Sequence, residues 1–177
     1  LPRRAKMHPI VVELKKFQYA EFASEETNCY SAEVWVNGVP SFTARNDGHG
    51  GPDNYQPIHN RNGIDLIEAY VKTLPHETLE GVEGSFPVSM EGFIGDMVED
   101  RLREKDINKH LKALTQRIMI VNSKGKVMQS GKVDLTKWTP EAMVKWAKGD
   151  TVINLLTPDK QRQAITQLVK GEPIKIS

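Results

Sequence analysis

The dipeptide Asn37-Gly38, set between two runs of strand-forming residues, constrains the fold of this chain more than any other feature. An Asn-Gly pair favours a two-residue type I′ turn, which joins two antiparallel strands directly. We therefore expect residues 29–36 and 39–45 to form a hairpin. Pro40 has no backbone N–H, so the returning strand is expected at the edge of its sheet, or at least with this missing donor placed outward.

A two-residue turn also determines which residues of the two strands face each other. The expected pairs are Val36 with Val39, Tyr30 with Arg45 and Cys29 with Asn46, unless a β-bulge shifts the register by one residue. Residues 24–28 then lead into the first strand at the same end of the hairpin at which the second strand finishes. Five polar or reactive side chains are expected to gather at this end: Glu25, Glu26, Cys29, Asp47 and His49.

The segment after the hairpin, residues 46–51, reads Asn-Asp-Gly-His-Gly-Gly. Glycine loses more backbone entropy on folding than any other residue, so three glycines in four positions are unfavourable without a structural reason. A simple hairpin turn needs only about two residues. We infer a shaped loop whose backbone passes close to another group.

Residues on both sides of this region show the periodicity of regular elements. Residues 10–22 carry β-branched and aromatic side chains typical of one or two strands. Residues 64–74 have apolar side chains at helical spacing, and the glycines and prolines of residues 75–87 predict a long loop. These patterns place a helix and a loop directly after the N-terminal strands.

The clearest amphipathic stripe in the chain covers residues 90–102 and predicts a helix of about four turns. Gly92 and Gly95 lie inside it and suggest close packing against a neighbouring element, because glycine lowers helix stability. Asp106 is placed to cap a further short helix that ends near Leu114.

The C-terminal third combines strand and helix signals. Residues 117–129 predict a hairpin, and residues 151–155 predict a strand. Helices are expected over residues 139–149 and 157–171, each with a threonine cap, an early proline and a final glycine.

The fold class is therefore α+β: an N-terminal antiparallel β-meander, a helical middle and a mixed β-α-β-α C-terminal part. We expect residues 1–177 to form a single compact domain, with any subdivision at residues 75–87, because separate halves would each bury a thin core.

Composition narrows the classes of function. With 24 basic and 23 acidic residues the net charge is +1, so no overall field attracts nucleic acid or anionic lipid, although a local basic patch is compatible with this total. Cys29 is the only cysteine, and a reducing, cytoplasmic compartment is the default. The chain has neither an apolar stretch of membrane-span length nor a secretory signal pattern. Residues 1–6 precede Met7, which is a candidate natural start.

The convergence expected at the hairpin end makes ligand binding the leading interpretation, because long shaped loops are commonly functional. The candidate ligand-binding residues are Glu25, Asn46, Asp47, Gly48, His49, Gly50, Gly51, Asn54 and Tyr55. The backbone amides of the glycine loop could hold an anion, although the loop matches no known nucleotide-binding motif.

Catalysis is an alternative interpretation of the same residues. Cys29 could act as the nucleophile and His49 as its base, oriented by Glu26 or Asp47. A lone cysteine at the start of a strand is more commonly a small buried apolar residue, so no catalytic residue is assigned. His49 and His59 lack any recognised metal-ligand spacing, and neither a metal nor a cofactor is assigned.

Nucleic-acid binding is a further alternative. The basic residues between Arg101 and Lys112 alternate with acidic residues, a pattern typical of a solvated helix face with i,i+4 pairs. We therefore do not favour this function from the sequence.

The motifs Ser24-Glu25-Glu26-Thr27-x-Cys29 and Asn46-Asp47-Gly48-His49-Gly50-Gly51, together with the Asn-Gly hairpin between them, resemble those of small bacteriophage and prophage proteins of unknown function. The resemblance is most evident over residues 15–58. It implies a viral accessory protein made in the bacterial cytoplasm, and it carries no activity. The leading hypothesis is thus a phage-type protein that binds a host macromolecule or a small anionic ligand through residues 24–29 and 46–55, with counter-defence as a context. The alternatives are a small hydrolase or transferase and a nucleic-acid-binding protein.

Overall fold

The computed structural model describes residues 9–78 and 80–176 and has the expected α+β fold. The chain divides into two compact units, Leu1–Glu99 and Asp100–Ser177. The division lies inside helix α2 (Met90–Ala113) and not in the loop of residues 75–87. A single domain over the whole chain stays a prediction, and residues 1–6 with their candidate start at Met7 lie outside the described residues.

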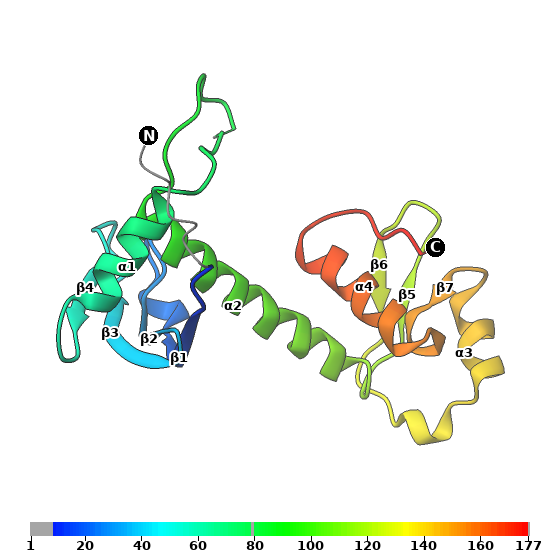
Figure 1. Ribbon diagram of the computed structural model, residues 1–177. Helices are drawn as coiled ribbons and strands as arrows, with labels where there is room; N and C mark the ends of the chain where they lie inside the picture. The colour runs from blue at the N-terminus through cyan, green and yellow to red at the C-terminus, as the bar shows by residue number, and fades with distance from the viewer. Residues whose placement is uncertain (1–8, 79, 177) are drawn as a thin grey trace. The chain divides into compact units, whose positions relative to one another are not determined.

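The first unit is built on a four-stranded antiparallel meander, which Figure 1 shows in blue and cyan. Its strands, in spatial as well as chain order, are β1 (Val12–Tyr19), β2 (Tyr30–Val36), β3 (Val39–Asn46) and β4 (Asn54–Pro57). The sequence did not predict β4, and β3 is therefore an internal strand and not the expected edge. The proline is tolerated because pairing with β4 begins only at Phe42, two residues beyond Pro40.

The β2–β3 hairpin has the expected turn but a shifted register. Asn37 and Gly38 have φ values of 50° and 78°, as a type I′ turn requires, and Val36 faces Val39. A bulge at Ser41 then shifts the pairing by one residue. Tyr30 consequently faces Asn46, which corrects the expected pairing with Arg45. The bulge turns Phe42, Ala44 and Asn46 to the buried face of the sheet.

Helix α1 (Asn62–Val71) packs against this sheet next to the bulge, where the Cα of Gly63 approaches the side chain of Ser41 closely enough to exclude a Cβ atom. The buried apolar side chains of the sheet, α1 and the start of α2 make up the core of this unit. They include Leu14, Val34, Phe42, Ile64, Ile67, Ile94 and Val98.

Helix α2 is continuous from Met90 to Ala113, so the separate short helix expected to begin at Asp106 does not form. No proline or glycine follows Gly95 in this helix, and nothing therefore interrupts it. The close packing suggested for the two glycines is also absent in the described part of the chain. A Cβ atom at Gly95 would meet no neighbour, and one at Gly92 would meet only Ser89 Oγ.

The second unit contains a small antiparallel sheet with the order β6-β5-β7. The elements are β5 (Met119–Val121), β6 (Val127–Gln129), η2 (Leu135–Lys137), α3 (Pro140–Ala147), β7 (Thr151–Val152), η3 (Ile153–Leu155) and α4 (Pro158–Val169). Both expected helices form, and Thr139 Oγ1 accepts a hydrogen bond from Ala142 N at 3.2 Å as the cap of α3. The strand expected over 151–155 is shorter, because its last three residues form the 3-10 turn η3.

The amide side chain of Asn154 joins three parts of this unit. Its Oδ1 accepts a hydrogen bond from Met119 N at 2.8 Å, and its Nδ2 donates to the carbonyl oxygens of Leu114 and Arg117 at 2.9 and 2.8 Å. The end of α2, the start of β5 and the η3 turn are thereby fixed to one another. None of the helices in the described part of the chain is long and apolar enough to cross a membrane.

Candidate functional site

The two loops at the end of the β2–β3 hairpin are bonded to each other through the backbone of Gly48. The carbonyl oxygen of Gly48 accepts hydrogen bonds from the backbone N–H groups of residues 25, 26 and 27 at 3.1, 2.9 and 3.3 Å. Gly48 has a φ of +86°, and a Cβ atom there would overlap the carbonyl oxygen of Ala23. Gly50 has a φ of +80°, and a Cβ atom would overlap the carboxylate of Glu26. The close backbone approach expected from the glycines is therefore made to the chain's own segment 23–27.

Asn46 is the hydrogen-bonded centre of this region. Among the described residues, Asn46 is the only buried residue with an amide or charged side chain, and its relative exposure is 7%. Its Oδ1 accepts from Thr27 Oγ1 at 2.7 Å and from Gly48 N at 2.9 Å. Its Nδ2 donates to Gly51 O at 2.9 Å and to Asp53 Oδ1 at 3.0 Å. All four hydrogen-bonding positions of the amide are satisfied, so Asn46 holds both loops in one arrangement.

Asp53 extends this network to two tyrosines. Its Oδ2 accepts from Tyr30 Oη at 2.6 Å and from Tyr55 Oη at 3.1 Å, and its backbone N–H donates to Glu91 Oε1 at 3.1 Å. Burial, reinforced by the Asp53 carboxylate, raises the pKa of both Tyr30 and Tyr55 above the ordinary tyrosine value. Both phenols therefore remain protonated donors at physiological pH.

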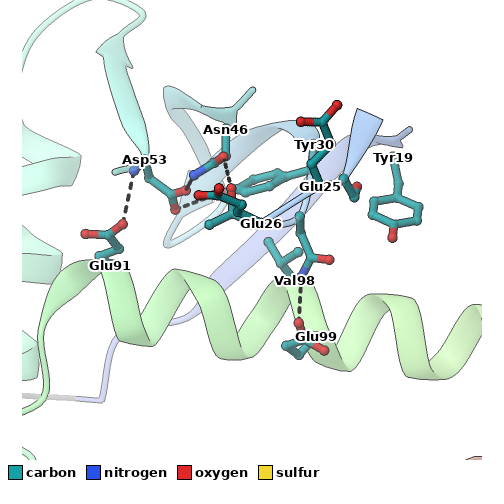
Figure 2. A pocket seen from close by; sticks show the side chains of 12 residues that line it. Tyr19, Glu25, Glu26, Tyr30, Asn46, Asp53, Glu91, Val98 and Glu99 are labelled. Atoms are coloured by element: carbon teal, nitrogen blue, oxygen red, sulfur yellow. Dashed lines mark hydrogen bonds between the residues drawn. The ribbon is translucent and has the colours of Figure 1, made fainter. Parts of the chain in front are cut away.

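An open pocket of about 470 Å³ lies between these loops and the first turns of α2 (Figure 2). Its lining includes five carboxylates, from Glu25, Glu26, Asp53, Glu91 and Glu99. Among the residues that the structure describes, no lysine, arginine or histidine lines the pocket. Asn28 Nδ2 donates to Glu99 Oε1 at 2.6 Å, which ties the loop to the helix. The pocket thus presents concentrated negative charge on a hydrogen-bonded frame.

The structure divides the candidate ligand-binding residues into three groups. Glu25 and Asn46 line the pocket, and Asn46 and Asp47 line a second pocket that shares Tyr19 and Tyr30 with it. His49 Nδ1 lies 3.3 Å from Glu25 Oε2 on the exposed surface, and Asp47 pairs with Arg45 at 3.3 Å. The remaining candidates, namely Gly48, Gly50, Gly51, Asn54 and Tyr55, shape or support the loops and line neither pocket.

The catalytic arrangement considered from the sequence is not assembled. His49 is bonded to Glu25 rather than to Glu26, and Cys29 Sγ has no hydrogen-bond partner within the described chain. The amides of Gly48 and Gly50 already donate to Asn46 Oδ1 and Thr27 Oγ1, so they are not free to hold an anion. No group of three or more possible metal ligands occurs among the residues that the structure describes.

Sequence reasoning missed Asp53, Glu91 and Glu99 as lining residues. The two glutamates are eight positions apart on α2, a spacing that puts them on one helix face, but the sequence gives no indication that this face meets the loops. Asp53 was not among the predicted ligand-binding residues, and its hydrogen bond with Asn46 depends on the register shift at Ser41, which places Asn46 on the buried face.

Beside the pocket the chain exposes a large aromatic side chain. Phe22 lies in the 3-10 turn η1 (Glu21–Ala23), between Tyr19 and Ser24, which both line the pocket, and it is 93% exposed. The turn is held by two backbone hydrogen bonds, and Ser24 Oγ adds bonds to Ala20 O and Cys29 N at 2.9 and 2.8 Å. Phe22 is thus presented to solvent on a fixed support.

Comparison with known proteins identifies no matching family model, no similar curated protein and no similar solved structure.

Proposed function

We propose that this protein binds a cationic segment of a host protein through residues 24–29, residues 46–55 and the first turns of α2. The observation that carries the proposal is the lining of the pocket, which has five carboxylates and, within the described part of the chain, no basic side chain. Carboxylates recognise lysine and arginine side chains through charge-assisted hydrogen bonds. A basic segment of a partner is therefore the ligand class that suits this pocket.

The charge of the whole N-terminal unit favours the same partner. Leu1–Glu99 contains 15 acidic and 8 basic residues, a net charge of −7. A field of this sign accelerates encounter with positively charged surfaces and opposes the approach of anions. The small anionic ligand considered from the sequence would lie against five carboxylates, so we prefer the cationic macromolecule.

Phe22 supplies the apolar part of the proposed interface. An almost fully exposed aromatic side chain on a hydrogen-bonded turn, beside charged groups, is typical of an interaction hot spot, where burial on binding provides most of the affinity. The partner surface we propose combines an apolar pocket for Phe22 with lysine or arginine side chains for the carboxylates. The resemblance to phage proteins supplies the context: a viral accessory protein that acts on a bacterial factor, with counter-defence as its purpose.

Affinity capture from a bacterial lysate, followed by binding measurements with each purified partner, tests this proposal. The test variant is Glu26→Gln/Glu91→Gln/Glu99→Gln, because glutamine retains the acceptor oxygens that bond Asp53 N and Asn28 Nδ2. The control is Glu68→Gln/Glu77→Gln/Glu83→Gln, which removes the same charge from exposed positions outside the pocket. We expect the test variant to weaken the complex at least about tenfold, or about 1.4 kcal/mol, with little effect of the control.

A second variant, Phe22→Ser, separates recognition from folding. The side chain is exposed in the free protein, so its replacement should leave the free energy of unfolding within about 0.5 kcal/mol of the original. Binding should fall by at least about tenfold. Equal capture of the same proteins by the wild type, the triple pocket variant and Phe22→Ser would show that this surface is not the binding site.

A further inference from the structure

The near-neutral charge of the chain conceals two units of opposite sign. Asp100–Ser177 contains 16 basic and 8 acidic residues, a net charge of +8. Leu1–Glu99 contains 8 basic and 15 acidic residues, a net charge of −7, which accounts for the total of +1. The second unit is therefore strongly basic for its size and has a positive electrostatic field of its own, although the whole chain is almost neutral.

Four of these basic residues form a stripe on the part of α2 that belongs to the second unit. Arg101, Lys105, Lys109 and Lys112 are all exposed, at intervals of four, four and three residues. With 3.6 residues per turn and a rise of 1.5 Å, they fall within an arc of about 80° and extend over about 16 Å. We call these four residues the basic stripe.

Two acidic residues of this part of α2, Asp100 and Glu104, pair with arginines that lie outside the basic stripe. Asp100 pairs with Arg103 at 2.7 Å, and Glu104 accepts two bonds from Arg162 of α4 at 2.6 and 2.8 Å. The Arg162 guanidinium lowers the pKa of Glu104, so this carboxylate stays ionised and paired. Asp106 lies about 140° around the helix from Arg101, outside the arc. Among the described residues, no carboxylate forms an ion pair with Arg101, Lys109 or Lys112.

We propose that the basic stripe binds the phosphate backbone of nucleic acid. Duplex DNA carries one negative charge per about 1.7 Å of its axis, so a stripe about 16 Å long spans about five base pairs and can meet several phosphates. Lysine and arginine contacts to phosphates position a protein without reading bases, so the binding is not sequence-specific.

The structure favours nucleic acid over an anionic membrane as the occupant of the basic stripe. A helix that binds a membrane surface inserts an apolar face below its basic residues. The apolar face of this part of α2 packs into the core of the second unit through Ile107 and Leu111. It is therefore not available to lipid, whereas the basic stripe on the other side is exposed.

Fluorescence anisotropy with the full chain and a labelled 25-base-pair duplex, measured between 50 and 200 mM KCl, tests this inference. The test variant is Arg101→Gln/Lys109→Gln/Lys112→Gln, since glutamine keeps a high helix propensity. The control, Lys124→Gln/Lys132→Gln/Lys160→Gln, removes the same charge from exposed positions of the same unit away from the stripe.

If three phosphates are neutralised by the mutated residues, the slope of log K against log salt should become less steep by about 2.7 in the test variant. In the wild type, an increase in KCl from 50 to 200 mM should then lower the affinity by about 40-fold through these three contacts alone. Three results would overturn the inference: no binding to the duplex at 50 mM salt, equal loss of slope in the control, or binding to phosphatidylglycerol vesicles without binding to DNA. Because the basic stripe and the acidic pocket lie in different units, failure of either proposal leaves the other to be judged on its own test.

Discussion

Replacing Asn46 with alanine is the most direct test of how the two loops are held. The substitution removes four hydrogen bonds, to Thr27, Gly48, Gly51 and Asp53. Each such bond contributes about 0.5–1.5 kcal/mol net, which gives an upper range of about 2–6 kcal/mol. Three of the four partners are at least partly accessible and can bond to water, whereas Gly48 N is buried. We therefore expect a loss of about 2–4 kcal/mol in the free energy of unfolding.

The assay should report on the first unit alone. Trp35 is the only tryptophan of that unit, and the other two, Trp138 and Trp146, lie in the second. In a Trp138→Phe/Trp146→Phe background, urea denaturation followed by fluorescence therefore reports on the β-sheet. Asn54→Ala is the matched control, because it makes the same chemical change at an exposed position of β4 and should change stability by less than about 0.5 kcal/mol.

Similar stability of the two variants would refute the argument that Asn46 organises the site. A loss above about 2 kcal/mol for Asn46→Ala alone would support it. The variant should also bind the host partner less well, because the 24–29 and 46–55 loops are no longer fixed relative to each other.

Three further predictions concern backbone geometry, alkaline stability and the second unit. Gly48→Ala should lower the free energy of unfolding by at least about 2 kcal/mol, while Gly51→Ala, where a Cβ atom meets open space, should change it by less than about 1 kcal/mol in urea denaturation. The pKa values of Tyr30 and Tyr55 are raised on folding, so their contribution to stability is fully present below about pH 10 and is lost above it, by up to about 1.4 kcal/mol per pH unit for each tyrosine. Denaturation curves between pH 9 and 12 should show this decline, and Tyr30→Phe should make it shallower. Asn154→Ala should destabilise the second unit by about 2–3 kcal/mol, because three backbone groups lose their partner, and the tryptophans of that unit should report an earlier transition.

Much of the fold could be predicted from local sequence chemistry. The Asn37-Gly38 turn and helices α3 and α4, each with a proline in its first turn, depend on a few neighbouring residues, and all three form. The expected threonine cap forms a side-chain hydrogen bond in α3 but not in α4. The α+β class followed from the same signals. By contrast, β4 is only four residues long and exists because β3 offers it a partner, which is a tertiary effect that residues 54–57 alone do not encode.

The candidate site was predicted in part. The convergence of residues 24–29 with the glycine loop followed from the turn alone and does not depend on the exact register, so it is found in the structure. The role of Asn46 was not foreseen, because a one-residue shift decides whether this side chain is buried. The carboxylates of Glu91 and Glu99 come from a helix far along the chain, and only tertiary packing brings them to the loops.

The bulge at Ser41 has a consequence for single-residue deletions in β3. Because Ser41 is the extra residue opposite Trp35, its loss would leave the pairs from Val34–Phe42 to Tyr30–Asn46 intact. It would remove the bulge, the hydrogen bond from Ile58 N to Ser41 O and the contact with Gly63. Loss of Thr43, two positions later, would move Asn46 to the opposite face of the sheet and separate the two loops. A single-residue deletion in β3 should therefore be tolerated better at position 41 than at position 43.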